Sequence, residues 1–265
     1  MSNNLEEELN KGGSMNKIMQ GDCLELMKDI PDGSVDMILA DLPYGTTACK
    51  WDTIIPFEPL WEQYKRIIKP NGAIVLTASQ PFTSALVMSN PKMFKYSWVW
   101  QKSRPTGHLN AKKQPMRKTE DICVFYSNQC QYNAQNLVAG TFDNTRPAKS
   151  NKIKGKGVHG MERSDFGLSA YTNYPTNILK FNNEHNVGNS VHPTQKPVAL
   201  FEYLIKTYTN EGDLVLDNVA GSGTTGVAAQ NLNRNFILME QEPEYIKIIE
   251  KRLADNFNKI GGLLR

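Results

Sequence analysis

Apolar runs of strand length alternate with helical patterns along most of this chain. Residues 35–41, VDMILAD, are almost continuously apolar, and residues 57–68 carry apolar side chains at helical spacing. Continuous apolar runs are typical of parallel strands that are covered on both faces. Because strands and helices alternate, the sequence predicts an α/β fold with a doubly wound, mostly parallel sheet.

Seven strands and five helices follow this rhythm. The predicted strands lie near residues 16–22, 35–41, 73–79, 96–102, 120–127, 214–220 and 235–240. The predicted helices lie near residues 23–30, 57–69, 197–209, 224–233 and 243–257. In sheets of this kind, ligands bind outside the carboxyl ends of the strands. We therefore expect functional residues directly after the strands at 35–41 and 214–220.

The alternating pattern is interrupted once. From residue 128 to 190, Asn, Gly, Lys and Ser replace most aliphatic residues, which predicts an inserted, loop-rich region between α/β halves at 16–127 and 191–265. Residues 1–15 lack periodicity and are expected to form a flexible tail. A chain of 265 residues is long enough to bury the core of one such domain.

Charge is distributed unevenly along the chain. The formal net charge is +3, yet residues 101–165 hold twelve Lys and Arg against five Asp and Glu. A basic segment of this size favours contact with a phosphate backbone over a purely solvated loop.

Other compositional features exclude several classes of protein. The acidic N-terminus is unlike a signal peptide, and no apolar run approaches the roughly 18 residues of a membrane helix. A cytoplasmic protein that makes no membrane contact is therefore expected. The four cysteines contain no C-x-x-C pair, so neither a disulfide framework nor a metal site is expected.

A glycine-rich turn stands between a predicted strand and a predicted helix. Residues 221–226, GSGTTG, match the G-x-G-x-x-G pattern, and Glu240 lies nineteen residues beyond Gly221 at the end of the next strand. Glycines let the backbone approach a ligand closely, and a carboxylate at the next strand's tip accepts hydrogen bonds from ribose hydroxyls. The pattern therefore predicts an adenosine-bearing cofactor.

Two further features bear on which cofactor this is. NAD-dependent dehydrogenases usually open with this unit, whereas here it lies in the last quarter of the chain. Asp217 also places a negative charge beside the turn, which suits a sulfonium and an α-ammonium group better than a pyrophosphate. We therefore favour S-adenosylmethionine, and a dehydrogenase is the alternative.

The tetrad Asp41-Leu42-Pro43-Tyr44 follows the predicted strand at 35–41. An exocyclic amino group of adenine or cytosine is a poor nucleophile, because its lone pair is delocalised into the ring. The Asp41 carboxylate and the Leu42 carbonyl can accept its two N–H bonds, and Pro43 stiffens the chain that aims them. Tyr44 offers a ring on which an extruded base can stack, a contact worth roughly 1 to 3 kcal/mol. The alternative is a strand-end turn in which Asp41 caps a helix and Tyr44 packs.

Four motifs in a fixed order give a specific resemblance. They are ADLPYG at 40–45, HPTQKP at 192–197, DNVAGSGTTG at 217–226 and MEQEPEY at 239–245. Together they resemble the amino-group DNA methyltransferases of the β arrangement, in which the catalytic motif precedes the cofactor motif. The resemblance covers nearly all of residues 16–257, and it implies the Rossmann-like fold of S-adenosylmethionine methyltransferases.

The resemblance also implies roles for parts of the chain and for single residues. Residues 16–127 would be the catalytic half, 128–190 the target-recognition region and 191–265 the cofactor-binding half. The target base would be held by Asp41, Leu42, Pro43 and Tyr44. The cofactor-binding residues would be Asp22, Cys23, Asp41, Lys196, Asp217, Asn218, Ala220, Gly221, Ser222, Gly223, Thr224 and Glu240.

Some of these residues have specific expected partners. Asp22 and Cys23 would contact the adenine of the cofactor, Glu240 its ribose and Lys196 its carboxylate. One departure from the family pattern concerns the residues after Asp217, where Asn and Val stand in place of the usual Pro and Phe. This change removes an aromatic surface that would face the cofactor.

The resemblance leaves more than one substrate open. Asp at the first position of the tetrad is associated mostly with adenine N6 and Ser mostly with cytosine N4, so Asp41 predicts N6-methylation of a flipped adenine in DNA. N4-methylation of cytosine is the first alternative, and a catalytically idle DNA-binding protein of the same fold is the second. An enzyme acting on RNA or on a protein glutamine is a third. A cognate restriction endonuclease is a candidate partner, and both a monomer and a homodimer remain open.

Overall fold

The computed structural model describes residues 15–45, 52–139, 171–183 and 195–263. The predicted tail at 1–15 lies outside the described residues except for Met15. The chain divides into unit 1, Met1–Asn133 with Asn177–Arg265, and the smaller unit 2, Ala134–Thr176. None of the described helices has the length and apolar character needed to cross a membrane.

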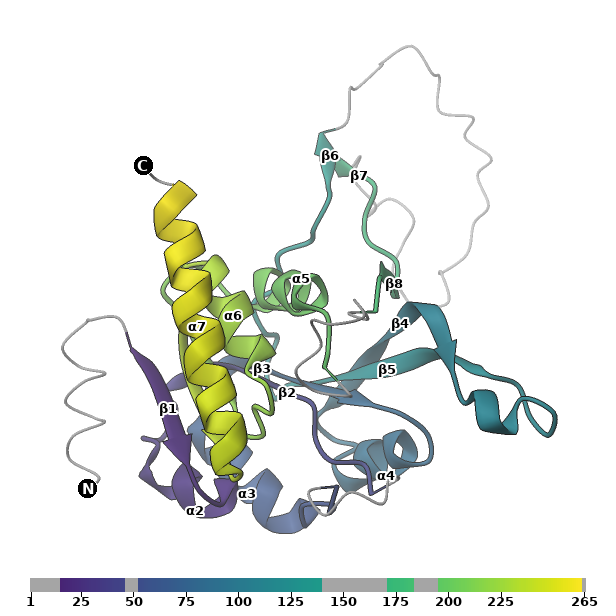
Figure 1. Cartoon of the computed structure of the whole chain (residues 1–265), viewed down its shortest axis with the longest axis horizontal. Helices are drawn as coiled ribbons and strands as arrows, with labels where there is room; N and C mark the ends of the chain where they lie inside the picture. Colours follow the sequence, from purple (N-terminus) through teal and green to yellow (C-terminus); the bar gives the residue numbers. More distant parts are fainter. Residues whose placement is uncertain (1–14, 46–51, 140–170, 184–194, 264–265) are drawn as a thin grey trace, which may run out of the picture. The chain divides into compact units, whose positions relative to one another are not determined.

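Unit 1 is built around a sheet in which the structure describes eight strands (Figure 1). In spatial order they are β1 (Asn16–Gln20), β10 (Asn235–Glu240), β9 (Leu214–Asp217), β2 (Val35–Ala40), β3 (Ile68–Ala78), β5 (Arg117–Phe125), β4 (Phe94–Thr106) and β8 (Ile178–Phe181). All neighbours are parallel except that β5 runs antiparallel to both β3 and β4. The predicted α/β fold with a mostly parallel sheet is confirmed.

The eighth strand corrects the predicted count of seven. β8 pairs with β4 at the sheet edge, from Val99↔Ile178 to Lys102↔Phe181. Its four residues, ILKF, stand in a polar stretch and are too few to show a periodicity. The predicted inserted region, 128–190, is therefore longer than unit 2 at both ends. Residues 128–133 and 177–183 belong to unit 1, and β8 within the second segment pairs with the main sheet.

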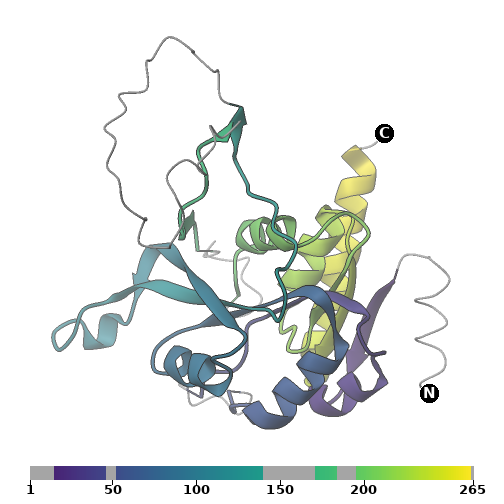
Figure 2. The ribbon, with the colours of Figure 1, turned by 180° about the vertical axis from the view of Figure 1, so that it is seen from behind.

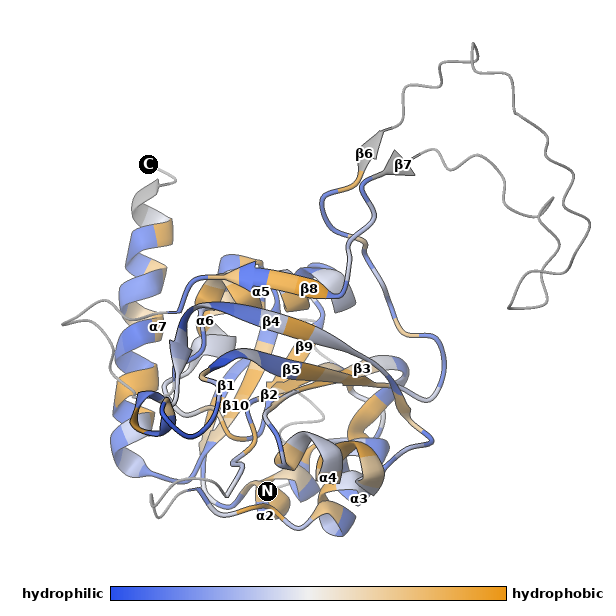
Figure 3. Ribbon diagram, turned by 90° about the vertical axis from the view of Figure 1, so that its right-hand side faces the viewer, coloured by the Kyte–Doolittle hydropathy of each residue, from blue (hydrophilic) through white to orange (hydrophobic). Residues whose placement is uncertain are grey.

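Helices cover both faces of the sheet (Figures 1 and 2). One face packs against α2 (Cys23–Leu26), α3 (Phe57–Ile67) and α4 (Phe82–Ser89), and the other against α5 (Val198–Tyr208), α6 (Thr224–Asn231) and α7 (Pro243–Leu263). Strand β2 shows why: Ile38 and Ala40 belong to the first core, whereas Met37 and Leu39 belong to the second. α7 covers the sheet with one side only, and its colour alternates between hydrophobic and hydrophilic in Figure 3.

Unit 2 contains one described pair of strands. β6 (Val138–Ala139) and β7 (Tyr171–Thr172) run antiparallel. Next to them, the side-chain amide of Asn173 donates a hydrogen bond to the carbonyl oxygen of Asn136 (2.8 Å). Residues 140–170, which make up most of this unit, lie outside the described part of the chain.

The residues that directly follow several strands lie close together on one side of the sheet, at the carboxyl ends of its parallel strands. The carboxyl ends of β2, β9 and β10 lie at this edge, because these three strands are parallel and adjacent. The antiparallel strand β5 enters the sheet at the same edge, where Asp121 pairs with Ala78 at the end of β3. Side chains from distant parts of the sequence therefore meet here.

Candidate active site

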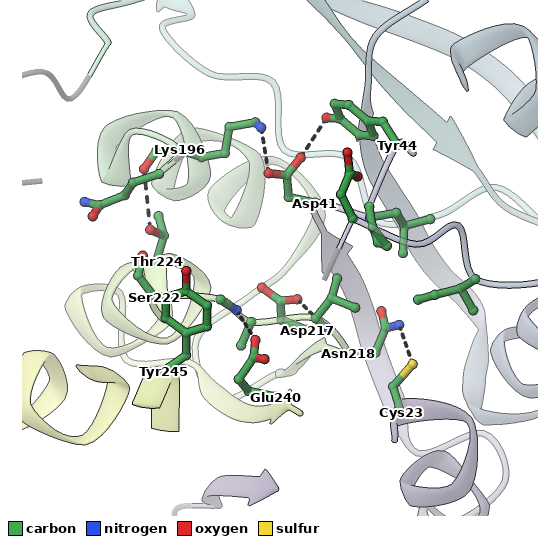
Figure 4. Close-up of a pocket in the computed structure, with 18 of the residues that line it drawn as sticks. Cys23, Asp41, Tyr44, Lys196, Asp217, Asn218, Ser222, Thr224, Glu240 and Tyr245 are labelled. Carbon is green, nitrogen blue, oxygen red and sulfur yellow. Dashed lines mark hydrogen bonds and ion pairs between the residues drawn. The ribbon is translucent and has the colours of Figure 1, made fainter. Parts of the chain in front are cut away.

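A cleft of about 560 Å³ opens at this edge of the sheet (Figure 4). It is lined by most of the predicted site residues, namely Asp22, Cys23, Asp41, Leu42, Pro43, Tyr44, Lys196, Asp217, Asn218, Ala220, Gly221, Ser222, Thr224 and Glu240. Gly223 is the exception among the predicted residues. The tetrad and the glycine turn, which are far apart in the sequence, thus share one cleft.

The carboxylate of Asp41 is fixed by three donors. Its Oδ1 accepts hydrogen bonds from the hydroxyls of Tyr44 (2.7 Å) and Thr77, and its Oδ2 accepts one from Lys196 Nζ (2.6 Å). A carboxylate has about four lone-pair sites, so one acceptor site of Asp41 remains. The side chain is 25% exposed, which allows a ligand in the cleft to reach that site.

Tyr44 is held on two sides. Its hydroxyl also contacts Thr77 Oγ1 (3.1 Å), and its ring stacks on Phe82 with centroids 5.2 Å apart. Burial, followed by the charges of Asp41 and Glu120, raises the pKa of the Tyr44 phenol well above its usual value, so the phenol stays protonated and donates to Asp41. Phe82 stacks on the ring, and Lys196 Nζ also lies over it, 5.7 Å from its centroid.

A chain of alternating charges extends from Asp41 across the cleft. Lys196 forms an ion pair with Glu120 Oε2 (3.5 Å), and Glu120 Oε1 accepts a hydrogen bond from Lys102 Nζ (2.9 Å). Burial lowers the pKa of the Lys196 ammonium, but the carboxylates of Asp41 and Glu120 more than offset it and the pKa is raised. In the structure Lys196, which was predicted to bind the cofactor, forms an ion pair with the carboxylate of Asp41.

Lys102 and Glu120 were not among the residues singled out by sequence. The signal available for Lys102 was its position two residues after Trp100 and four after Trp98, since side chains at this spacing share one face of a strand. Both tryptophans are buried, and so is Lys102. A lysine on a buried face requires an acid nearby. Which acid this is depends on the register of β4 and β5, and here it is Glu120.

The glycine turn joins β9 to α6 and is held by Glu240. Gly221 adopts a left-handed backbone (φ 52°), and its N–H donates to Glu240 Oε2 (2.8 Å). Glu240 Oε1 accepts from the backbone N–H groups of Gln241 (2.8 Å) and Glu242 (2.9 Å). Burial raises the pKa of the Glu240 carboxyl, and these hydrogen bonds oppose the rise. The acid expected at the ribose thus lies directly beside the turn.

Gly223 serves the packing of α6 rather than the lining of the cleft. It stands at the N-terminal cap of α6 with φ 79°. A Cβ at this position would lie 3.0 Å from Ile249 on α7, a contact tight enough that the Ile249 side chain would have to shift. The absence of a side chain at Gly223 thus lets the start of α6 pack closely against α7.

Asp217 is a buried acid at the end of β9. Its side chain accepts hydrogen bonds from the hydroxyl of Thr225 (2.5 Å) and the N–H of Val219 (3.1 Å). Burial nevertheless raises the pKa of Asp217 to about 7, and the nearby charges of Asp41 and Glu240 contribute to the rise. A cation bound next to this carboxyl would stabilise its ionised form.

Asn218 ties the turn to two helices. Its Oδ1 accepts a hydrogen bond from the hydroxyl of Tyr64 on α3 (2.6 Å), and its Nδ2 donates to the sulfur of Cys23 on α2 (3.5 Å). Burial raises the pKa of the Cys23 thiol, so it is neutral. Asp22 caps α2 by accepting from the N–H of Leu24 (2.8 Å). The departure from the family pattern at Asn218 is therefore matched by buried polar partners.

The structure is therefore an α/β protein with one cleft that holds both a G-x-G-x-x-G turn and a group of partly or fully buried charged residues: Asp41, Glu120, Lys102 and Lys196. Comparison with known proteins agrees with this fold. The family model N6_N4_Mtase, described as DNA methylase, matches residues 35–251. The chain therefore belongs to this DNA methylase family.

Curated relatives cover most of the chain. It is 27% identical over 262 residues to the Type II methyltransferase M.HpaI of Haemophilus parainfluenzae, covering 93% of this chain and 77% of the relative. It is 29% identical over 272 residues to the Type II methyltransferase M.HinfI of Haemophilus influenzae, covering 91% of this chain and 69% of the relative.

Solved structures share the fold. The M1.HpyAVI–SAM complex is 26% identical with a TM-score of 0.62, and the match covers 90% of this chain and 99% of that chain. The PvuII cytosine-N4-specific DNA methyltransferase is 17% identical with a TM-score of 0.64, with 93% of each chain covered, and shows likeness of fold alone.

Proposed function

We propose that this chain is a site-specific Type II DNA methyltransferase that methylates the exocyclic N6 of an adenine extruded from DNA. Membership of the DNA methylase family supports a DNA substrate, and the names of the relatives support the Type II class. The observation that carries the proposal is the fixed carboxylate of Asp41, which lines the same cleft as the Gly221 turn.

S-adenosylmethionine is the methyl donor, and when bound it supplies a methyl group on a sulfonium. The structural neighbour solved as a SAM complex supports this cofactor. The residues present fit it: Asp217 is a buried acid whose ionised form a cation would stabilise, and Glu240 stands beside the turn for the ribose. A Cβ built on Gly221 meets no atom within 4 Å, so the backbone there is open to a close ligand.

The chain's own residues make the amino group of the base reactive. The remaining acceptor site of Asp41 takes one N–H of the amino group, and the backbone carbonyl of Leu42 takes the other. Two acceptors in this arrangement favour a pyramidal nitrogen with a free lone pair. Lys196 forms an ion pair with Asp41, and the hydroxyl of Tyr44 fixes the orientation of the Asp41 carboxylate. The reaction then depends on alignment and electrostatics rather than on a strong base.

Analysis of methylated nucleosides tests this proposal. We expect that unmethylated DNA incubated with the protein and methyl-labelled cofactor yields labelled N6-methyladenine after digestion to nucleosides. The variant Asp41→Ala should yield none, whereas Asp255→Asn, an exposed acid on α7, should match the unaltered protein. Labelled N4-methylcytosine would overturn the adenine assignment, and the absence of any label would favour an idle DNA-binding protein.

The recognition of a particular DNA sequence is a separate part of the proposal. The predicted recognition region at 128–190 is basic and amide-rich, and such side chains can reach phosphates and groove edges. A cognate restriction endonuclease as partner and a cytoplasmic location belong to the same proposal. Exchange of residues 134–176 with those of a relative of different specificity should move the methylated site without abolishing methylation.

A further inference from the structure

The hairpin between β4 and β5 extends beyond the body of unit 1 (Figures 1 and 2). Strand β4 continues to Thr106, a short 3-10 helix (His108–Asn110) follows, and β5 begins at Arg117. Every residue from 108 to 119 is exposed. The connection between the two strands, residues 107–116, has ten residues, more than the two to five that are usual between antiparallel strands.

This hairpin is strongly basic. Residues 103–119 contain five cationic side chains and no acid: Arg104, Lys112, Lys113, Arg117 and Lys118. Within the part of the chain that the structure describes, none of the five lies in an ion pair. Unpaired cations in this number create a positive potential that matches a phosphate backbone.

The tip of the hairpin carries an unprotected apolar side chain. Leu109 lies in the 3-10 helix and is fully exposed, at 101% of its reference area. His108 and Asn110 flank it, and Lys112 and Lys113 follow on the same turn. Exposure of this apolar side chain to water does not stabilise the fold. Proteins that bend DNA use such a side chain, with cations around it, as a wedge between two base steps.

The base of the hairpin is fastened beside the cleft. Asn183 accepts hydrogen bonds from the hydroxyl of Ser103 (3.2 Å) and the N–H of Arg104 (3.3 Å), and its Nδ2 donates to the Arg104 carbonyl (3.3 Å). Thr106, Arg117 and Asn183 line the cleft that also holds Asp41. The hairpin thus continues one side of the cleft outward.

We propose that residues 103–119 form a DNA-contacting hairpin whose Leu109 enters the duplex beside the target base and takes up the space that the extruded base leaves. The cations of the hairpin bind the adjacent phosphates. This inference rests on the proposed function, because it concerns how a base reaches the cleft. It adds a residue far from the tetrad to the set that determines activity on duplex DNA.

The variant Leu109→Ala tests the wedge with two substrates. We expect its kcat/KM to fall about tenfold or more on a fully paired duplex, because the wedge offsets part of the cost of unstacking the target base. On a duplex in which the target base faces an abasic site, the loss should be less than about twofold, since that base is already unpaired. Met88→Ala on α4, another exposed apolar residue (72%), should match the unaltered protein on both substrates.

A second measurement does not depend on activity. A plot of log affinity for DNA against log salt concentration has a negative slope. The double variant Lys112→Ala/Lys113→Ala should make this slope shallower by about two. The control Lys251→Ala/Lys259→Ala, with two exposed lysines on α7, should leave the slope unchanged.

Two results would overturn the inference. One is an equal effect of Leu109→Ala on the paired and abasic substrates, and the other is an unchanged salt slope for the hairpin double variant. If the unaltered protein methylates DNA while Leu109→Ala behaves identically, only the hairpin inference fails. If the unaltered protein transfers no methyl group to any DNA, the proposed function fails, and the salt slope still decides whether the hairpin contacts DNA.

Discussion

At the scale of single residues, the ammonium of Lys196 lies between two carboxylates. It is 2.6 Å from Asp41 Oδ2 and 3.5 Å from Glu120 Oε2, and all three side chains are at most one quarter exposed. Water screens charges weakly in such a place, so each charge depends on its neighbours. Removing the ammonium leaves the carboxylate of Asp41 without a counter-ion, which costs more than the intact pair contributes.

The variant Lys196→Met should lose both activity and stability. We expect the free energy of unfolding to fall by about 3 to 5 kcal/mol in urea titrations, because the partly buried carboxylate of Asp41 loses its counter-ion and Glu120 keeps only Lys102. The matched control is Lys247→Met, which removes the exposed ion pair with Glu244 (3.1 Å) and should cost less than about 1 kcal/mol. Equal costs for the two variants would show that the Asp41–Lys196 pair is no more important than a surface pair.

Asp217 is the residue through which pH should change the affinity for the cofactor. Its pKa of about 7 in the folded protein exceeds the ordinary value of 3.8 for an aspartic acid, so between about pH 4 and pH 7 the folded protein holds a proton that the unfolded chain has lost. The contribution of this group to stability therefore falls as the pH rises through that window. Binding of a cation favours the ionised carboxyl and offsets this cost.

The affinity for S-adenosylmethionine should accordingly rise with pH and level off above about pH 7. Isothermal titration calorimetry of the unaltered protein and of Asp217→Asn between pH 5.5 and pH 7.5 measures this. The variant should bind more weakly and lose most of the pH dependence, while its stability at pH 7.5 equals or exceeds that of the unaltered protein. A profile that is the same for both proteins would exclude Asp217 as the titrating group.

At the scale of elements, sequence patterns were sufficient where burial was continuous. Strands β2, β9 and β10 were predicted because each is an apolar run covered on both faces, and Asp41, Asp217 and Glu240 stand at their ends. The predicted strand at 214–220 was too long, because β9 ends at Asp217. Helix α4 and strand β8 were not predicted. α4 has only eight residues with Ser and Thr among the apolar ones, and β8 is held by pairing with β4 rather than by a pattern of its own.

The contacts between elements were beyond sequence patterns for a related reason. Lys102 and Glu120 each look like an ordinary polar residue at a strand end, and only the antiparallel register of β4 and β5 brings them together. Likewise the amide of Asn218 finds Tyr64 and Cys23 only after α2 and α3 have packed on the sheet. Spacing along the chain does not encode such partners.

Asn218 should stabilise the junction of the turn with α3. We expect Asn218→Ala to lower the free energy of unfolding by about 1 to 3 kcal/mol, because the buried hydroxyl of Tyr64 loses its acceptor. Adding Tyr64→Phe to this variant should restore part of the loss, since the unpaired hydroxyl is then gone. Strictly additive costs in the double variant, measured by chemical denaturation, would show that the two side chains are not coupled.

At the scale of the whole molecule, the site is assembled from both halves of the sequence. Asp41 and Lys196 are 155 positions apart, and the sheet brings them within hydrogen-bonding distance. The order of strands also places the glycine turn and the tetrad at the ends of neighbouring strands, β9 and β2. The central claim is that one cleft holds an extruded base and the cofactor at the same time.

A crystal structure of the protein with a non-reactive analogue of the cofactor and a DNA duplex containing its target site tests this claim most directly. We predict an adenine outside the helix with its exocyclic nitrogen within hydrogen-bonding distance of the Asp41 carboxylate, and the analogue against Gly221 with its ribose at Glu240. A base that remains stacked in the duplex, or one bound away from Asp41 while the analogue occupies the cleft, would contradict the account.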